Sequence, residues 1–352
     1  MSRFLKEKYN ILEAYTPGEQ PRDGEYIKLN TNESPFSPAP EVVEILKKND
    51  IERLRLYCDP CSTELKASLA KLYNLDSENI FLSNGSDDIL NFAMMAFSDK
   101  GAIFPDITYG FYPVFAELHG VEYEEIPLKA DFTVDENNYI SKDKLIFIAN
   151  PNAPTGMELS LESIEKIVAS NPNSVVVIDE AYVDFGGTSA LPLISKYENL
   201  LVVRTYSKSR CMAGARLGYA FASKAIIEDL EKIKFSTNPY NINSLTAKLG
   251  VATVNSNDYY EAKCKEIISV REYTSEKLRE MGFTVLSSKA NFIFAKSDII
   301  GGDELYLKLK ERKILIRHFA KDRIKDFNRI TIGTKEQMDI FLENIGEILK
   351  ER

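Results

Sequence analysis

Between residues 41 and 245, short apolar runs typical of strands alternate with helical patterns. The short runs are Ile80–Leu82, Ala102–Phe104, Val121–Leu128, Leu145–Ala149, Val175–Ile178, Leu200–Val203 and Leu217–Ala222. Runs without polar alternation are typical of strands buried on both faces, as in parallel sheets that helices cover. Amphipathic segments separate the runs, as at Leu161–Ser170, where Ser160 is a suitable N-cap. The alternation predicts a large α/β domain over 41–245 with a mostly parallel sheet.

The pattern changes after residue 245. A long helical stretch covers 257–281, and short strand candidates follow at Thr284–Leu286, Asn291–Ala295, Ile314–His318 and Ile330–Ile332, with helices near 303–312 and 335–350. These elements predict a smaller α+β domain over 246–352.

Residues 1–40 are irregular and rich in proline. We therefore expect an N-terminal arm that packs with the small domain or with a partner subunit.

Composition narrows the class of protein. The chain has 352 residues, of which 44% are hydrophobic and 28% charged, so it is long enough for two globular domains. It contains no apolar run near the roughly 20 residues that a membrane-spanning helix needs. The first residues lack an apolar stretch, so we expect no secretory signal. We expect a cytoplasmic protein. The net charge, 44 − 53 = −9, disfavours nucleic acid as the main partner.

Cysteine and histidine are scarce. Cys58 and Cys61 form a C-x-x-C without a second pair at zinc spacing, and His119 and His318 are the only histidines. The two cysteines are best interpreted as incidental thiols in a turn. A multi-histidine metal site is disfavoured, and most Ser-His-Asp arrangements are excluded, so we expect no metal.

The most informative stretch follows the run Leu200–Val203. There Ser207 and Lys208 come at a strand end, and Arg216 follows in a loop that contains glycine. A lysine in that place can form a Schiff base with an aldehyde cofactor, while a serine and an arginine can bind a phosphate on it. A Ser-Lys pair alone is a weak signal, because most lysines are solvated surface residues.

Three other strand ends strengthen this interpretation. Asp179 follows the run Val175–Ile178, where a carboxylate can hold a pyridinium nitrogen protonated. Gly85 and its neighbours lead from a strand into a helix whose backbone N–H groups can hold phosphate. Residues 150–156, Asn-Pro-Asn-Ala-Pro-Thr-Gly, follow the strand Leu145–Ala149. A phosphate cup, an amide, an acid and a lysine are thus expected along one edge of the sheet.

This set of motifs resembles the fold-type I pyridoxal phosphate enzymes of the class I/II aminotransferase branch, over essentially the whole chain. Within that branch it is most similar to the histidinol-phosphate aminotransferases. The motifs that carry the likeness are Tyr15-Thr16-Pro17-Gly18, residues 29–35 (Leu-Asn-Thr-Asn-Glu-Ser-Pro), Tyr57 before Asp59-Pro60, residues 316–319 (Ile-Arg-His-Phe) and residues 329–334 (Arg-Ile-Thr-Ile-Gly-Thr).

The resemblance implies a role for each matching residue. Lys208 would hold pyridoxal 5'-phosphate covalently, Asp179 would face its ring nitrogen, and Tyr182 its ring hydroxyl. The remaining cofactor contacts would come from Gly85, Ser86, Asp87, Tyr109, Asn152, Ser207 and Arg216. Tyr57 would reach the cofactor phosphate of the neighbouring subunit in a homodimer. The substrate would contact Tyr15, Asn32, Arg317 and Arg329.

Two positions depart from the family pattern. Ala153 stands where the branch usually has the asparagine that meets the ring hydroxyl, so we assign that contact to Asn152, one residue earlier. The loop 209–212 reads Ser-Arg-Cys-Met, whereas many relatives have Ala-Phe-Gly-Leu.

The implied function is transamination of L-histidinol phosphate with 2-oxoglutarate in histidine biosynthesis. An aromatic or broad-range aminotransferase and a threonine-phosphate decarboxylase are alternatives within the fold. A transcription regulator that senses the cofactor is disfavoured, because residues 1–40 are too short and proline-rich for a helix-turn-helix. A structural protein of this fold would be expected to lose the lysine, and Lys208 is present.

Overall fold

A computed structural model describes residues 4–6, 9, 12–13, 15–21, 24–47 and 54–351. Its largest element is a seven-stranded sheet in the order β2-β8-β7-β6-β5-β3-β4. The strands are β2 (Ile80–Ser83), β3 (Ala102–Pro105), β4 (Tyr123–Ile126), β5 (Leu145–Ala149), β6 (Val176–Asp179), β7 (Leu200–Thr205) and β8 (Gly218–Ala222). Strand β8 runs antiparallel to β7 and β2, and the other pairs are parallel. The mostly parallel sheet expected from the apolar runs is confirmed.

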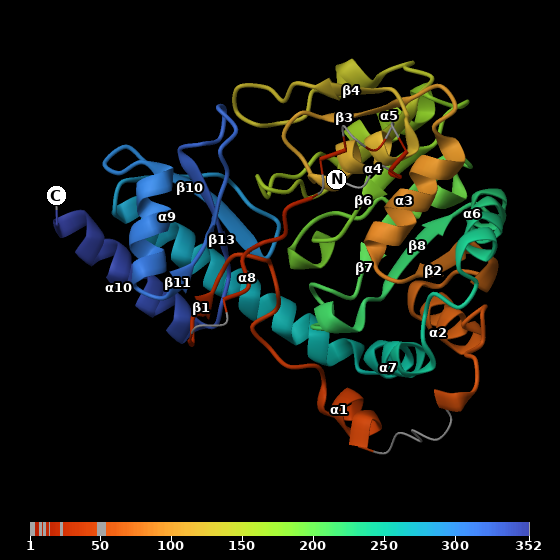
Figure 1. Cartoon of the computed structure of the whole chain (residues 1–352), viewed down its shortest axis with the longest axis horizontal. Coiled ribbons are helices and arrows are strands. Elements are labelled where there is room, and N and C mark those ends of the chain that lie inside the picture. Colours follow the sequence, from red (N-terminus) through yellow and green to blue (C-terminus); the bar gives the residue numbers. More distant parts are fainter. Residues whose placement is uncertain are drawn as a thin grey trace.

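Helices cover both faces of this sheet, as Figure 1 shows. On one face, α3 (Ser86–Phe97), α4 (Phe111–His119) and α6 (Lys224–Thr237) pack on residues such as Phe147. On the other, α2 (Thr63–Tyr73), α5 (Leu161–Ser170) and α7 (Ser244–Asn255) pack on its neighbours Ile146 and Ile148. Successive strand side chains point to opposite faces, so a strand covered twice must be apolar throughout. We call this part of the molecule the large-sheet region.

A second sheet lies in the C-terminal part, in the order β12-β13-β10-β9. Its strands are antiparallel and are β9 (Phe283–Val285), β10 (Phe292–Ser297), β12 (Arg317–His318) and β13 (Phe327–Thr331). Helices α9 (Gly302–Glu311) and α10 (Lys335–Lys350) accompany it, and α8 (Asn257–Glu280) runs from the large-sheet region to it (Figure 1). We call this part the small-sheet region.

The N-terminal arm joins the small-sheet region. Its strand β1 (Ile27–Lys28) pairs in parallel with β11 (Ile314–Leu315), and in Figure 1 the red chain then crosses toward α1 (Pro40–Lys47). The short 3-10 helices are η3 (Ser77–Asn79), η4 (Glu136–Tyr139), η5 (Val183–Phe185), η6 (Leu191–Ser195) and η7 (Ala213–Ala215).

Some predicted element limits were wrong. The predicted strand Ile314–His318 is two strands, because β11 pairs with the arm whereas β12 pairs with β13. Helix α5 and its N-cap are confirmed, since the Ser160 side chain accepts a hydrogen bond from the Ser163 N–H. The domain limits at residues 40 and 245 stay a prediction, and part of the expected arm lies outside the described residues. Within the described part of the chain, no helix is long and apolar enough to cross a membrane.

Candidate active site

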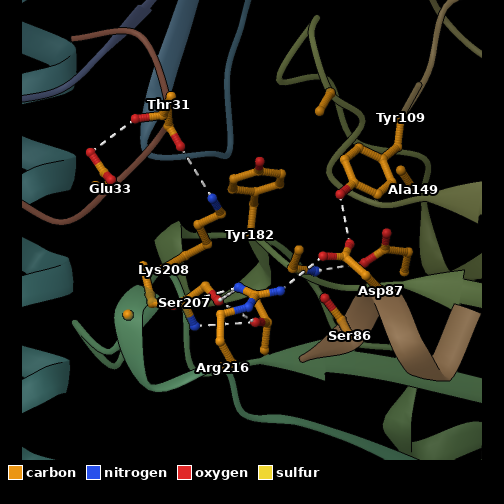
Figure 2. A pocket seen from close by; sticks show the side chains of 16 residues that line it. Thr31, Glu33, Ser86, Asp87, Tyr109, Ala149, Tyr182, Ser207, Lys208 and Arg216 are labelled. Carbon is orange, nitrogen blue, oxygen red and sulfur yellow. Dashed lines mark hydrogen bonds and ion pairs between the residues drawn. The ribbon is translucent and has the colours of Figure 1, made fainter. Parts of the chain in front are cut away.

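A cavity of about 330 Å³ lies at the carboxyl ends of β5, β6 and β7 (Figure 2). It is lined by Thr31, Glu33, Ser86, Asp87, Tyr109, Ala149, Ala153, Asp179, Ala181, Tyr182, Thr205, Ser207, Lys208, Ala213, Gly214 and Arg216. Parallel strands bring their carboxyl ends to one edge, which is where α/β proteins bind ligands. The predicted lysine, acid and phosphate cup therefore meet in one place.

Lys208 projects into this cavity from the loop after β7. Its Nζ donates to the Thr31 carbonyl oxygen at 3.3 Å and lies 5.8 Å from the centre of the Tyr182 ring. Burial, and after it the positive charge of Arg329, lower the pKa of the amine to about 8. A lysine with a lowered pKa is partly neutral near physiological pH, and a neutral amine is a nucleophile and a base.

Asp179 ends β6 and faces the cavity floor. Its Oδ2 accepts a hydrogen bond from the buried Tyr112 hydroxyl at 3.1 Å, and its Oδ1 accepts from the Ala181 N–H at 3.2 Å. Burial raises the pKa of this carboxyl to about 6, although both hydrogen bonds act to lower it. A buried carboxylate of this kind is stabilised by a cationic partner, so the floor of the cavity suits a protonated ring nitrogen.

The predicted phosphate cup is the turn where β2 leads into α3. No side chain caps the N-terminus of α3, so its first N–H groups are available to an anion. The Ser86 and Ser207 side chains line the same end of the cavity. Arg216 completes the cup, with its guanidinium donating to Asp87 Oδ2 at 3.0 Å and lying 3.5 Å from Ser207 Oγ.

Backbone constraints hold this cup in shape. Arg216 has a φ of 53°, a left-handed conformation that is uncommon outside glycine and is often found at functional sites. Gly85, at the helix cap, has a φ of 90°, and a Cβ there would lie 2.7 Å from an Arg216 nitrogen. The cup therefore needs glycine at this position for both conformation and space.

Two tyrosines form the upper wall of the cavity in Figure 2. The Tyr109 hydroxyl donates to Asp87 Oδ1 at 2.7 Å, and this contact fixes its ring beside the phosphate cup. The Tyr182 hydroxyl accepts a hydrogen bond from the Asn32 side chain at 2.9 Å. Burial is the main reason that the pKa of each phenol is raised, so both stay protonated.

Asn32 links the arm to both sheets. Its side chain meets Tyr182 on one end and accepts from the Thr331 hydroxyl at 2.9 Å on the other, and its carbonyl accepts from the Asn291 side chain. It is 1% exposed, and its φ of 56° is left-handed. These contacts engage its amide within the protein, and a direct substrate contact stays a prediction.

Arg317 and Arg329 lie opposite each other on β12 and β13. Both line a second hollow of about 380 Å³ that also includes Tyr15 and shares Tyr109 with the cavity. Arg329 donates to the Asn30 carbonyl at 3.0 Å, but among the described residues its buried Nε has no hydrogen-bond acceptor. A buried cationic donor without a partner suits an anionic ligand.

Asn152 and Tyr57, which were predicted to contact the cofactor, do not line the cavity. Asn152 Nδ2 donates to the Ile107 carbonyl and to Thr155 Oγ1, while its neighbour Ala153 lines the cavity. Tyr57 is 84% exposed and stacks on Tyr240 with ring centres 4.5 Å apart. The ring-hydroxyl role of Asn152 and the partner-site role of Tyr57 both stay predictions.

Sequence reasoning missed Tyr112 and the Thr31 carbonyl. Tyr112 lies in the first turn of α4, and Tyr109 precedes that helix, so no helical spacing in the sequence linked the two rings. The Thr31 contact could not be found, because a backbone carbonyl has no sequence signature and depends on how the arm crosses the site.

The residues present fit the cofactor that the motifs imply. Pyridoxal phosphate needs a cationic cup for its phosphate, an acid for its ring nitrogen and an amine for its aldehyde. Those three groups are Arg216 with the uncapped α3 N-terminus, Asp179 and Lys208, and all border one cavity. No group of three or more metal-ligating side chains occurs among the described residues.

Comparisons with known proteins agree with this geometry. The model of the family "Aminotransferase class I and II" matches residues 24–345. The histidinol-phosphate aminotransferase of Brachyspira hyodysenteriae is 49% identical, over 99% of this chain and 100% of its own length. The crystal structure of the histidinol-phosphate aminotransferase from Clostridium acetobutylicum superposes with a TM-score of 0.86 at 25% identity, covering 93% of this chain and 100% of that one. The Sinorhizobium meliloti histidinol-phosphate aminotransferase, solved in complex with pyridoxal-5'-phosphate, has the same fold, with a TM-score of 0.84 at 22% identity over 93% of this chain and 92% of that one.

Proposed function

The chain belongs to the class I and II aminotransferase family, and from that membership we propose that it transfers the amino group of L-histidinol phosphate to 2-oxoglutarate. The products are imidazole-acetol phosphate and L-glutamate, and the reaction serves histidine biosynthesis. The 49% identity to a histidinol-phosphate aminotransferase over nearly the whole chain supports this substrate. The structural observation that carries the proposal is the buried Nε of Arg329, which has no hydrogen-bond partner in the described part of the chain and lies beside the cavity that holds Lys208.

The cofactor we propose is pyridoxal 5'-phosphate. When bound, it would supply an electron sink for the electron pair left on the substrate's α-carbon when its proton is removed. Arg216, Ser86, Ser207 and the α3 N-terminus would hold its phosphate, and Asp179 would face its ring nitrogen. These assignments rest on the cavity lining and on the uncapped helix end.

Lys208 is the base that moves the proton. Its amine has a pKa lowered to about 8, so a substantial fraction is neutral and ready to accept a proton from the substrate's α-carbon. The Thr31 carbonyl, 3.3 Å away, orients Nζ. Tyr112 keeps the Asp179 carboxylate pointed at the cavity floor, because its hydroxyl donates to Oδ2.

Arg317 and Arg329 bind the anionic end of each substrate. Guanidinium groups give paired N–H donors that suit a phosphate in one half-reaction and a carboxylate in the other. Burial and the positive charge of Arg317 lower the pKa of Arg329, and the negative charge of a bound anion would act in the opposite direction. Tyr15, from the arm, lines the same hollow and could add a hydroxyl to the phosphate.

The functional unit we propose is a homodimer in which Tyr57 completes the neighbour's phosphate cup. Leu54 and Leu56, close to this residue in the chain, are exposed, and so is Tyr240, which stacks on it. A set of exposed apolar residues of this size is typical of a protein–protein interface. The Tyr57 ring lies on the outer surface and outside its own cavity lining, which suits a contact with another copy.

Replacing Arg329 by alanine tests the substrate assignment. Arg329→Ala should weaken binding of both histidinol phosphate and glutamate by roughly 2–5 kcal/mol, because a buried cationic donor is lost. Cofactor loading should be unchanged, since Arg216 serves that phosphate. Arg312→Ala is the control. Arg312 lies at the end of α9, where it pairs with Glu347 of α10. Steady-state KM values for both substrates equal to those of the parent would reject the assignment.

A further inference from the structure

The loop between β12 and β13 connects the two substrate arginines and also contacts the large-sheet region. It covers residues 319–326, between Arg317 on β12 and Arg329 on β13. Four of its residues, Phe319, Ala320, Lys321 and Ile324, line the hollow that contains both arginines. The position of this loop therefore affects where the arginines stand relative to the rest of the site.

Arg323 makes three of the polar contacts that cross between the two regions. Its Nη1 donates to Asp106 Oδ2 at 2.7 Å, and its Nη2 donates to the Leu128 and Lys129 carbonyls at 3.0 Å each. Asp106 directly follows β3, and its other oxygen accepts the Leu128 N–H at 2.9 Å. One guanidinium thus binds a carboxylate and two carbonyls of the large-sheet region, which is a specific geometry that lysine does not reproduce.

Neighbouring contacts support the same attachment. Lys321 Nζ donates to the Asp106 carbonyl at 2.6 Å. Beneath the polar contacts lies a small apolar cluster with members from both regions: Ile107, Leu128, Phe132, Phe294, Ile324 and Phe327. We call Arg323, Lys321, Asp106 and this cluster the clasp.

The position of the clasp bears on the distance between the Lys208 amine and the two arginines of the anion site. Lys208 belongs to the large-sheet region, whereas Arg317 and Arg329 belong to the small-sheet region. A substrate that carries its amine and its phosphate on one small molecule spans both. The arm fixes one side of this span, through Asn32 and Thr331, and the clasp fixes the other.

We propose that Arg323 is a positioning residue for the substrate's distal anion. It touches neither the cavity nor the reacting atoms, and it holds the loop that sets the place of Arg317 and Arg329 relative to Lys208. This inference rests on the proposed function, because it assumes a substrate with an anion remote from its amine.

Paired substrates and matched variants separate positioning from general damage. In the holoenzyme, Arg323→Gln should raise KM for L-histidinol phosphate by about tenfold while kcat changes less. With L-histidinol, which lacks the phosphate, kcat/KM should stay within about twofold of the parent value. Arg323→Lys should recover part of the loss, since an ammonium reaches fewer of the acceptors. Lys325→Gln is the control, because it removes the same charge from the same loop. Lys325 pairs with Asp322 inside that loop.

A double-mutant cycle and proteolysis give independent readouts. Asp106→Asn combined with Arg323→Gln should raise KM no more than Arg323→Gln alone, if the two residues act through their mutual contact. Tryptic cleavage after Lys321 should be about fivefold faster in Arg323→Gln than in the parent or in Lys325→Gln, because the loop opens more often.

Each outcome decides the proposal. Unchanged KM for histidinol phosphate in Arg323→Gln would overturn it, as would an equal loss of kcat/KM with histidinol and histidinol phosphate. If the parent enzyme itself does not use histidinol phosphate, the proposed function fails instead. In that case the rate of cleavage after Lys321 still decides whether Arg323 holds the loop.

Discussion

At the scale of single residues, Lys208 and Asp179 carry opposite pKa shifts in one cavity. Burial lowers the pKa of the amine to about 8 and raises that of the carboxyl to about 6. In each case burial disfavours the charged form, and among the described residues neither group forms an ion pair that would offset it. Two buried groups that each resist ionisation are typical of a functional site rather than of a structural ion pair.

The lowered pKa of Lys208 predicts how its reactivity depends on pH in the cofactor-free protein. The neutral amine reacts, so the rate of acylation at Lys208 should rise with pH up to about 8 and then level off. In the urea-unfolded protein the rate at this residue should continue to rise toward about pH 10. Peptide mass spectrometry after brief labelling measures both. A folded-state rate that still rises steeply above pH 9 would contradict the shift.

Residues with distinctive local sequence could be predicted at this scale, whereas their partners often could not. Lys208, Asp179 and Arg216 follow strand ends or glycine-containing loops, and the structure brings all three to one cavity. Tyr112 and Asn32 matter through contacts with Asp179 and Tyr182, which are distant in sequence. Such contacts depend on the packing of the arm and of α4, which no short motif records.

At the scale of elements, the phosphate cup depends on how closely β8 approaches the turn before α3. Gly218 begins β8 and lies opposite Ser83 of β2. A Cβ at Gly218 would lie 2.3 Å from the Ser86 nitrogen and 2.4 Å from the Gly85 carbonyl carbon. Both neighbours are backbone atoms, so they could make room only by shifting the turn.

Gly218→Ala should therefore weaken cofactor binding. The displaced turn would misdirect the N–H groups at the start of α3, and we expect the dissociation constant of pyridoxal phosphate to rise about tenfold or more. Titration of the cofactor-free protein measures this constant. Gly346→Ala is the control, because a Cβ there meets no atom within 4 Å. Equal affinity in the two variants would show that the cup tolerates a methyl group at Gly218.

Elements with strong periodicity could be predicted well, and short strands could not. The buried strand Leu145–Ala149 and the helix Leu161–Ser170 have the limits that the sequence indicated. The run 314–318 reads as one strand, but its two halves pair with different partners, β1 and β13. Pairing between segments almost 300 residues apart is decided by tertiary packing, which local pattern does not contain.

At the scale of the whole molecule, the proposed dimer makes each active site depend on two chains. Tyr57 would serve the site of one subunit while Lys208 of the same chain serves its own. The exposed apolar residues around Tyr57 and Tyr240 give this arrangement a physical cause, since association would remove them from water.

Mixing two defective variants tests the shared site. Tyr57→Phe and Lys208→Ala homodimers should each have low activity. After subunit exchange at equal amounts, half of the dimers would be mixed, and each mixed dimer would hold one site with both Tyr57 and Lys208. Activity should then rise to about a quarter of the parent value. Activity that stays at the average of the two separate variants would contradict the shared site.

The central claim is that this chain transfers an amino group from L-histidinol phosphate with Lys208 as the base. The most direct test is glutamate formation by the purified holoenzyme from 2-oxoglutarate, with L-histidinol phosphate, L-histidinol or O-phospho-L-threonine as the donor, in the parent and in Lys208→Ala. We predict that the parent forms glutamate fastest with histidinol phosphate and that Lys208→Ala loses this activity by several orders of magnitude. Release of carbon dioxide from phosphothreonine without glutamate formation, or unchanged turnover in Lys208→Ala, would contradict the claim.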